Sequence, residues 1–445
     1  MRTLIYAFLI LSTTIDYLHS MQWAPASAPY FIDVFSGFLG AYVFVGLVRS
    51  RFQNMRIAYV VMLAFLGVVF VCSVVANNID AGPVLAGSRL WLRMLPFFVL
   101  PAVVPIDDRT LWRQLMLLLG ICMLQFPLAL SQRFHEYGHE FGSGDRTFGT
   151  LMGSGIQSIF LICAACVLAG FFIRKRISLS VFAPLVLWTL ASTTINETKA
   201  TFILAPVGFI ATFLAGTPPE RRVRNGLLAL AVTVLFLIVF VQMYDAIEGV
   251  RNKESVVDFF LSDKQLANYL SSSARGSAKA AKVGPGRVET LTGPLGILAR
   301  DPANLAFGVG PGNAGDSSLG PQFAGRYAGS LGRYIQTTGS RLLAELGLLG
   351  IGGTLMLLWL ILADSRYLAY RDSSTCGALA IGWTGVVPVM VISMFYSAPS
   401  LFIGVSVPFW YLSGVLATRR AALSHRPSIA AQQGEGTAVR FTVDG

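Results

Sequence analysis

The feature that most constrains this chain is a succession of long apolar stretches that recur from residue 3 to residue 417. A membrane-spanning helix needs roughly 20 apolar residues, and the sequence offers about twelve such stretches. Hydrophobic residues make up 54% of the chain and charged residues 13%, about half the charged fraction of a typical soluble domain. The sequence therefore predicts one all-α polytopic membrane domain over residues 1–420, with spans near 3–18, 30–48, 57–76, 87–105, 112–130, 151–173, 177–194, 198–215, 226–244, 342–363, 376–394 and 400–417.

The first stretch has a second interpretation as a signal peptide. Arg2 precedes a short apolar run, and the sequence APASA follows it. Pro29 after that motif and the eleven later stretches favour a retained helix. Cleavage would leave the rest of the topology unchanged.

Arginine and lysine clusters mark alternate ends of these stretches. Positive residues in short loops indicate the cytoplasmic side of a membrane protein. The clusters predict that both termini are cytoplasmic and that residues 245–341 form one large extracytoplasmic loop. The net charge of +11 is then mainly a topology signal, and no nucleic-acid partner is predicted. The clusters are Arg49/Arg51/Arg56, Arg109/Arg113, Arg174/Lys175/Arg176, Arg221/Arg222/Arg224, Arg366/Arg371 and Arg419/Arg420/Arg426.

The loop at 245–341 is far longer than the connections usual in a compact domain, and such loops usually carry function. Its first part, residues 253–270, has apolar residues at helical spacing and predicts a helix lying on the membrane surface. Its second part is basic and rich in glycine. Beyond the last apolar stretch, the polar mixture at 421–445 predicts a disordered cytoplasmic tail.

A second group of cations breaks the positive-inside pattern, because its members lie at predicted outer helix ends or in the outer loop. A cation is disfavoured by about 0.3–1 kcal/mol at a helix N-terminus, and an ionised side chain within the bilayer costs about 3 kcal/mol. Four helices repeat this arrangement, which is explained if an anion lies among them. Snorkelling to the outer headgroups is the alternative. The group predicts a concave site for phosphate or pyrophosphate. Its members are Arg89, Arg93, Arg146, Lys199 and Arg341 from the helices, and Arg287 and Arg300 from the loop.

Three short motifs have simpler explanations than the sites they resemble. Residues 135–139 read HEYGH, the zinc-peptidase pattern, but a glycine lies inside the motif and no further ligand is near, so a solvated loop is preferred. Residues 308–312 read GVGPG without the βαβ surroundings of a dinucleotide site, and predict a tight turn. Cys163 and Cys166 lie inside an apolar stretch and predict helix packing. No metal, cofactor or disulfide framework is predicted.

Four local motifs carry a resemblance to a known family. They are DRTFGT at 145–150, NETKAT at 196–201, GRVETLTGPLGILARDPANLAFGVGPGN at 286–313 and LLAELGLLGIGG at 342–353. In this order and spacing, the chain resembles the O-antigen ligase and Wzy-type polymerase superfamily of bacterial inner-membrane glycosyltransferases. That family has about a dozen helices and one large periplasmic loop late in the chain, as the hydropathy here also predicts.

One departure from the family pattern separates two activities. The ligases place a histidine nine residues before the glutamate that corresponds to Glu345, and this sequence has Gln336 there. An amide cannot act as a general base near neutral pH. The resemblance therefore implies a polymerase of exopolysaccharide, capsule or O-antigen, which joins polyprenyl-pyrophosphate-linked oligosaccharide repeats at the periplasmic face of the inner membrane.

The resemblance also implies roles for particular residues. Arg287 and Lys199 would clamp the pyrophosphate without a metal, aided by Arg89, Arg93 and Arg146, with Arg300 and Arg341 as secondary candidates. The general base stays open among Glu289, Asp301 and Glu345, and Glu345 has the alternative role of supporting the start of its helix. Beside the lipid-linked glycan and the bilayer, a chain-length regulator and a flippase are possible partners.

Two other functions remain open from the sequence. The same fold can transfer finished glycan to a different acceptor, as a ligase does. A chain of this kind can also be a flippase for lipid-linked glycans or another transporter. Transporters usually show internal repeats and polar residues near mid-membrane. This sequence shows no obvious repeat, and its unusual charges gather at the predicted outer face.

Overall fold

The computed structural model describes residues 1–25, 27–136, 147–215, 220, 222–249, 255–271, 285–317 and 319–434. This part of the chain is helical and contains no β-strand. Seven of its helices are long and apolar enough to cross a membrane, or up to eight if one bent pair forms a single span. They contain Tyr30–Arg49, Ile57–Ala76, Asp108–Phe134, Ser154–Ile173, Val223–Ala246, Thr338–Arg371 and Thr375–Tyr396. The predicted all-α polytopic membrane class is confirmed. The number of twelve spans and the side on which the termini lie stay predictions.

Within the described part, a helix occupies each predicted apolar stretch. The boundaries differ most at the basic ends, where several helices extend beyond the apolar run. The helices are α1 (Arg2–Ser20), α2 (Ala28–Arg49), α3 (Ile57–Ala76), α4 (Ala81–Leu92), α5 (Leu95–Val103), α6 (Asp108–Ser131), α7 (Ser154–Ile173), α8 (Leu179–Ile195), α9 (Thr201–Ala215), α10 (Arg222–Gly249), α17 (Thr338–Arg371), α18 (Thr375–Tyr396) and α19 (Ile403–Gly434).

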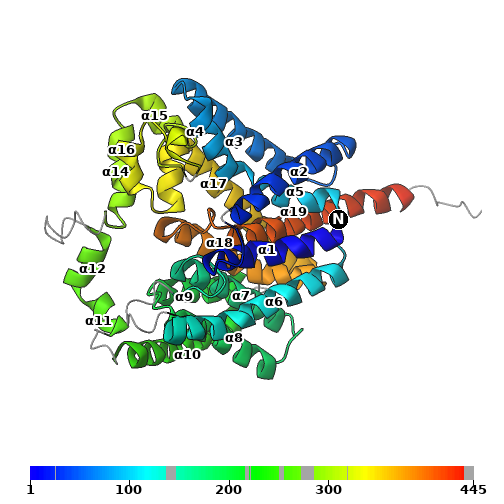
Figure 1. The fold of residues 1–445 in the computed structure, drawn as a ribbon. Coiled ribbons are helices and arrows are strands. Elements are labelled where there is room, and N and C mark those ends of the chain that lie inside the picture. The colour runs from blue at the N-terminus through cyan, green and yellow to red at the C-terminus, as the bar shows by residue number, and fades with distance from the viewer. Residues whose placement is uncertain are drawn as a thin grey trace, which may run out of the picture.

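The segment between α10 and α17 lies at one end of the bundle, as the green and yellow helices in Figure 1 show. The N-terminus and the far end of α19 lie at the opposite end. A chain whose two ends share one side of the bundle, with its long loop on the other, fits the predicted topology. This segment contains α11 (Val256–Leu261), α12 (Asp263–Leu270), α14 (Glu289–Leu298), α15 (Pro302–Phe307), η5 (Pro321–Phe323), α16 (Ala328–Leu331) and η6 (Gly332–Tyr334).

The predicted surface helix at 253–270 is two short helices in the structure. Ser262 interrupts it with an extended backbone, and its hydroxyl accepts a hydrogen bond from the Gln265 amide at the start of α12. Ser255 caps α11 in the same way. Serine competes with the backbone for hydrogen bonds and so favours helix starts over helix interiors.

The predicted span at 87–105 is also divided. Helices α4 and α5 meet at 48° across Arg93 and Met94. The carbonyl of Arg93, freed by the break, accepts a hydrogen bond from the Ser36 hydroxyl at 2.5 Å. The break turns α4 toward the loop segment.

The centre of the bundle depends on small residues where α7, α9 and α18 cross. A Cβ atom at Gly170 would lie 2.5 Å from the carbonyl oxygen of Ala378, and one at Gly208 would lie 2.6 Å from the Cys166 sulfur. Small residues allow this close approach of helices within a bilayer. Cys166 packs against Gly208 in this crossing, and Cys163 and Cys166 are free thiols.

At the C-terminal end, α19 continues as a helix to Gly434, past the boundary predicted at residue 421. Residues 435–445 lie outside the described part, and disorder of the tail stays a prediction for them.

Candidate functional site

The glycine-rich turn at 308–312 is bound to a break in α17. Gly347 has φ 67° and ψ −165°, which interrupts the helix. The carbonyl oxygens of Ala344 and Glu345 are thereby released, and they accept hydrogen bonds from the amides of Val309 at 2.8 Å and Gly310 at 3.0 Å. The predicted tight turn is therefore present, and its role is to attach the loop segment to α17.

The same turn approaches α4 closely from its other side. A Cβ atom at Gly87 would lie 2.2 Å from the Gly312 nitrogen, and a Cβ atom at Gly312 would lie 2.0 Å from the carbonyl oxygen of Pro83. Gly312 also has φ 77°, a conformation that favours glycine. The turn thus fits between α4 and α17 only because glycine occupies both contact points.

Glu345 is the side chain that holds these three elements together. It is completely buried, and its carboxylate accepts a hydrogen bond from Trp91 Nε1 of α4 at 2.6 Å. Arg341, one helical turn earlier, contributes Nη1 at 3.4 Å, and the Gly312 amide donates from the loop. A buried carboxylate with this many donors is fixed in place, so Glu345 orients Arg341 and the turn.

Above this contact lies a polar pocket of about 200 Å³ between α4, the loop and α17. Arg89 and Arg341 line it with Glu345 and Asp316, and Leu401 closes one side. Two guanidinium groups and two carboxylates leave these four side chains formally neutral. We call this the mixed pocket. A neutral mixture of donors and acceptors suits sugar hydroxyls better than a pyrophosphate.

Arg89 and Arg93 converge on one residue that sequence reasoning missed, Asp33 of α2. Arg89 lies 3.2 Å and Arg93 lies 3.3 Å from its carboxylate. Arg93 also donates to the Leu401 carbonyl oxygen. Arg93 therefore connects α2, the α4–α5 break and the segment between α18 and α19. Arg89 contacts Asp33 and also lines the mixed pocket.

Lys199 and Arg287 belong to a second cluster, built on aromatic rings. Lys199 Nζ lies 3.5 Å from the centre of the Phe259 ring in α11. The Phe259 ring packs edge-on against Tyr269 of α12, with centroids 5.6 Å apart. The Arg287 guanidinium lies 5.8 Å from the Tyr269 ring and 5.2 Å from the Tyr396 ring. We call these five residues the cation–aromatic cluster.

The residues that carry this cluster are placed by buried polar contacts. Lys199 follows Asn196, whose amide donates to the Ser154 carbonyl oxygen at 3.0 Å and so fixes the α8–α9 turn beside the start of α7. Phe202 stacks on Phe260 with centroids 5.1 Å apart, which holds α11 over α9. The short helices of the loop therefore cover Lys199.

One short segment links the two sites. Tyr396 contacts Arg287, and Leu401 lines the mixed pocket. Five residues of extended chain reach at most about 18 Å, which bounds the separation of these two residues. The predicted single cationic site is thus two neighbouring sites, one positive and aromatic, the other mixed in charge.

The remaining predicted residues lie elsewhere. Arg300 is exposed at the end of α14. Arg146 and residues 137–139 of the HEYGH motif lie outside the described residues. Among the described residues, no three His, Cys, Asp or Glu side chains gather as a metal site needs.

Two of the candidate bases serve as local structural ties. Glu289 accepts hydrogen bonds from the Ser271 hydroxyl at 3.0 Å and the Gly286 amide at 3.1 Å. Asp301 caps α15 through the Ala303 amide at 2.9 Å. Asp316, which sequence reasoning did not single out, is by contrast an exposed carboxylate in the mixed pocket. Its place four residues after the glycine-rich turn was the available signal.

An apolar cavity of about 330 Å³ adjoins the mixed pocket. Leu90 lines both spaces, and Trp91 lines the cavity while its Nε1 binds Glu345. Val71 and Leu92 also line the cavity and are exposed on the lateral surface of the helix bundle. A hydrocarbon-lined space thus lies directly beside a polar one.

In comparisons with known proteins, no family model matches this chain and no curated protein matches its sequence.

Proposed function

We propose that this protein is a membrane glycosyltransferase that joins polyprenyl-pyrophosphate-linked oligosaccharide repeats into a polysaccharide. The reaction would take place at the extracytoplasmic face of a bacterial inner membrane, on the side where α11 to α16 lie. The observation that carries the proposal is the cation–aromatic cluster, in which Lys199 and Arg287 are gathered on three aromatic rings at this end of a membrane bundle.

The chemistry of this cluster fits a sugar pyrophosphate. Two cations held on aromatic faces can bind an anionic leaving group, and the rings offer flat apolar surfaces to a pyranose. The adjoining apolar cavity supports a substrate that is itself part hydrocarbon and part polar, as a lipid-linked glycan is. Since the mixed pocket is formally neutral, we assign the pyrophosphate to Lys199 and Arg287 and the acceptor sugar to the mixed pocket.

The proposed step is a single displacement at an anomeric carbon. An acceptor hydroxyl oxygen forms a bond to that carbon, and the bond from the carbon to the pyrophosphate oxygen breaks with its electron pair. Lys199 and Arg287 stabilise the charge that develops on the departing polyprenyl pyrophosphate. The hydroxyl proton goes to the carboxylate of Asp316, the exposed acid of the mixed pocket.

The test is reconstitution of the full chain in proteoliposomes with polyprenyl-pyrophosphate-linked repeats, followed by separation of products by size. The wild type is expected to give a ladder of polymers. Arg287→Ala is expected to lower the rate about a hundred- to thousandfold, the usual effect of losing one preorganised donor to a developing anion. Arg333→Ala is the matched control, because Arg333 is an exposed loop arginine whose side chain contacts Tyr334.

Other outcomes would support other functions. Transfer of a single glycan to an added acceptor, with no ladder, would indicate a ligase and would show that Gln336 does not exclude that activity. Translocation of the lipid-linked glycan with no new glycosidic bond would indicate a flippase. A ladder of normal length from Arg287→Ala would contradict the proposed clamp.

A further inference from the structure

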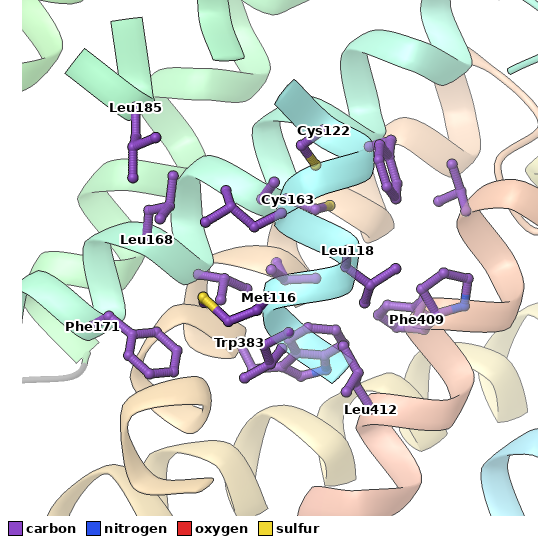
Figure 2. Close-up of a pocket in the computed structure, with 18 of the residues that line it drawn as sticks. Met116, Leu118, Cys122, Cys163, Leu168, Phe171, Leu185, Trp383, Phe409 and Leu412 are labelled. Carbon is purple, nitrogen blue, oxygen red and sulfur yellow. The ribbon is translucent and has the colours of Figure 1, made fainter. Parts of the chain in front are cut away.

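A second pair of adjoining spaces, one apolar and one basic, extends from the middle of the bundle to the end opposite the loop segment. The apolar cavity has a volume of about 300 Å³ and lies between α6, α7, α8, α18 and α19. Figure 2 shows side chains from these helices, among them Leu118, Phe171 and Trp383, pointing into a common space. Nearly all of its surface is carbon or sulfur.

This cavity reaches the lipid-facing surface of the bundle. Met116 of α6 and Val181 of α8 line it and are 38% and 46% exposed. Both residues lie in apolar helices near the basic end. A hydrocarbon chain of the surrounding bilayer can therefore enter from the side without crossing a polar surface.

Next to the cavity is a basic pocket of about 810 Å³. Its cations are Arg174, Lys175 and Arg176, in the connection from α7 to α8, and Arg224 near the start of α10. Among the described residues that line it there is no carboxylate. Ile177 lines both this pocket and the apolar cavity, so the two spaces share a wall.

Two of these cations are held in position by carbonyl groups, and the carboxylate that interacts with Arg174, that of Asp372, is shared with Arg419. Arg174 donates to the carbonyl oxygen of Ala369 at 2.8 Å, and Arg176 donates to that of Ser373 at 2.9 Å. Carbonyl groups orient a guanidinium but carry no full charge. The nearby carboxylate of Asp372 is engaged by Arg419 at 2.7 Å. The pocket therefore presents fixed positive charge to an incoming anion.

We propose that an anionic phospholipid binds here, with its phosphate on Arg174, Lys175, Arg176 and Arg224 and one acyl chain in the apolar cavity. Basic pockets between membrane helices on the cytoplasmic side bind anionic lipid headgroups. A topology signal alone requires positive charge near the membrane, but not a pocket that shares Ile177 with an apolar cavity of about 300 Å³. The proposal does not depend on the glycosyltransferase function.

The test is native mass spectrometry of the full chain in the presence of phosphatidylglycerol or phosphatidylcholine. Phosphatidylglycerol is expected to remain bound in preference. The double variant Lys175→Gln/Arg224→Gln is expected to lose about thirtyfold in affinity, because each cation near an anionic headgroup contributes a factor of about five and the two factors multiply. The matched control is Arg109→Gln/Arg113→Gln, which removes two exposed charges from the same end outside the pocket.

A second variant tests the apolar half independently. Ala164 lines the cavity, and Ala164→Leu is expected to reduce lipid retention while the basic pocket stays intact. Equal retention of both lipids would overturn the proposal, because binding would then show no preference for an anionic headgroup. Equal losses in the two double variants would overturn it in favour of general surface electrostatics. Stronger binding of a polyprenyl phosphate than of phosphatidylglycerol would also overturn it, because the ligand would then be an isoprenoid.

Discussion

Gly347→Ala is the substitution with the most clearly defined structural cost. The backbone at this position has φ 67° and ψ −165°, a region that is essentially restricted to glycine, and side chains there cost about 1–3 kcal/mol. A Cβ atom would also lie 2.4 Å from the Ala306 carbonyl oxygen. Relief of that contact moves the turn and weakens the two hydrogen bonds from Val309 and Gly310, each worth about 1 kcal/mol. We expect a total loss of about 2–5 kcal/mol.

The control lies in the same helix. Gly352 has no atom within 4 Å of the position where a Cβ would lie, so Gly352→Ala is expected to be neutral or to stabilise by about 0.5–1 kcal/mol. The assay is thermal unfolding of both variants in the same detergent, followed by tryptophan fluorescence. A Gly347→Ala protein as stable as Gly352→Ala would refute the argument that the break in α17 depends on glycine.

Two further substitutions test the proposed base and the basic end of the bundle. Asp316→Asn is expected to lower the polymerisation rate at least about a hundredfold, because an amide cannot take the acceptor proton. Asp301→Asn, at an exposed helix cap outside the mixed pocket, is expected to keep the wild-type rate. A loss of rate in Asp301→Asn but not in Asp316→Asn would assign the base to Asp301. Asp372→Asn is expected to destabilise the protein by about 1–2 kcal/mol at pH 7. Burial alone would raise the pKa of Asp372, but hydrogen bonds from Arg419 and Ser374 outweigh it and hold that pKa below its usual value. The stabilisation is therefore present above about pH 4, the unfolded value, and is lost as the pH falls through the folded pKa. The melting temperatures of wild type and variant should converge below that pH, and a constant difference would contradict the assignment.

The helices and the membrane class could be predicted because long apolar stretches are what a chain needs to cross a bilayer. The breaks inside them could not. Arg93 and Pro96 lie at the α4–α5 bend and Glu345 lies beside Gly347, but such single residues do not show that Ser36 and the turn at 308–312 will satisfy the carbonyl groups that the breaks release. A period of hydrophobic residues carries no information about such distant partners.

The candidate site was predictable in its residue types but not in its grouping. The sequence shows that Arg89, Lys199 and Arg287 are unusual, because each is a cation at a predicted outer helix end or in the outer loop. The sequence does not show which carboxylate forms an ion pair with which guanidinium group. Asp33 is a single acid in an apolar stretch and has no motif around it, yet its carboxylate forms ion pairs with both Arg89 and Arg93. Because Asp33 pairs with Arg89 and Arg93, the proposed anion site is assigned to Lys199 and Arg287 and no longer to all seven predicted cations.

The contacts of Glu345 also decide which parts of the outer segment can move. Because one buried carboxylate joins α4, the turn at 308–312 and α17, displacement of the turn would remove the Gly312 donor from a buried charge. We therefore expect the part of the loop from α14 to α17 to keep a fixed position relative to α4 and α17. Helices α11 and α12 are attached at both ends, because Ser255 and Val256 donate hydrogen bonds to Asp245 of α10 and Ser271 donates one to Glu289 of α14. Between these attachments, the ring contacts at Phe259 and Phe260 are the part of the pair that can shift without breaking a hydrogen bond.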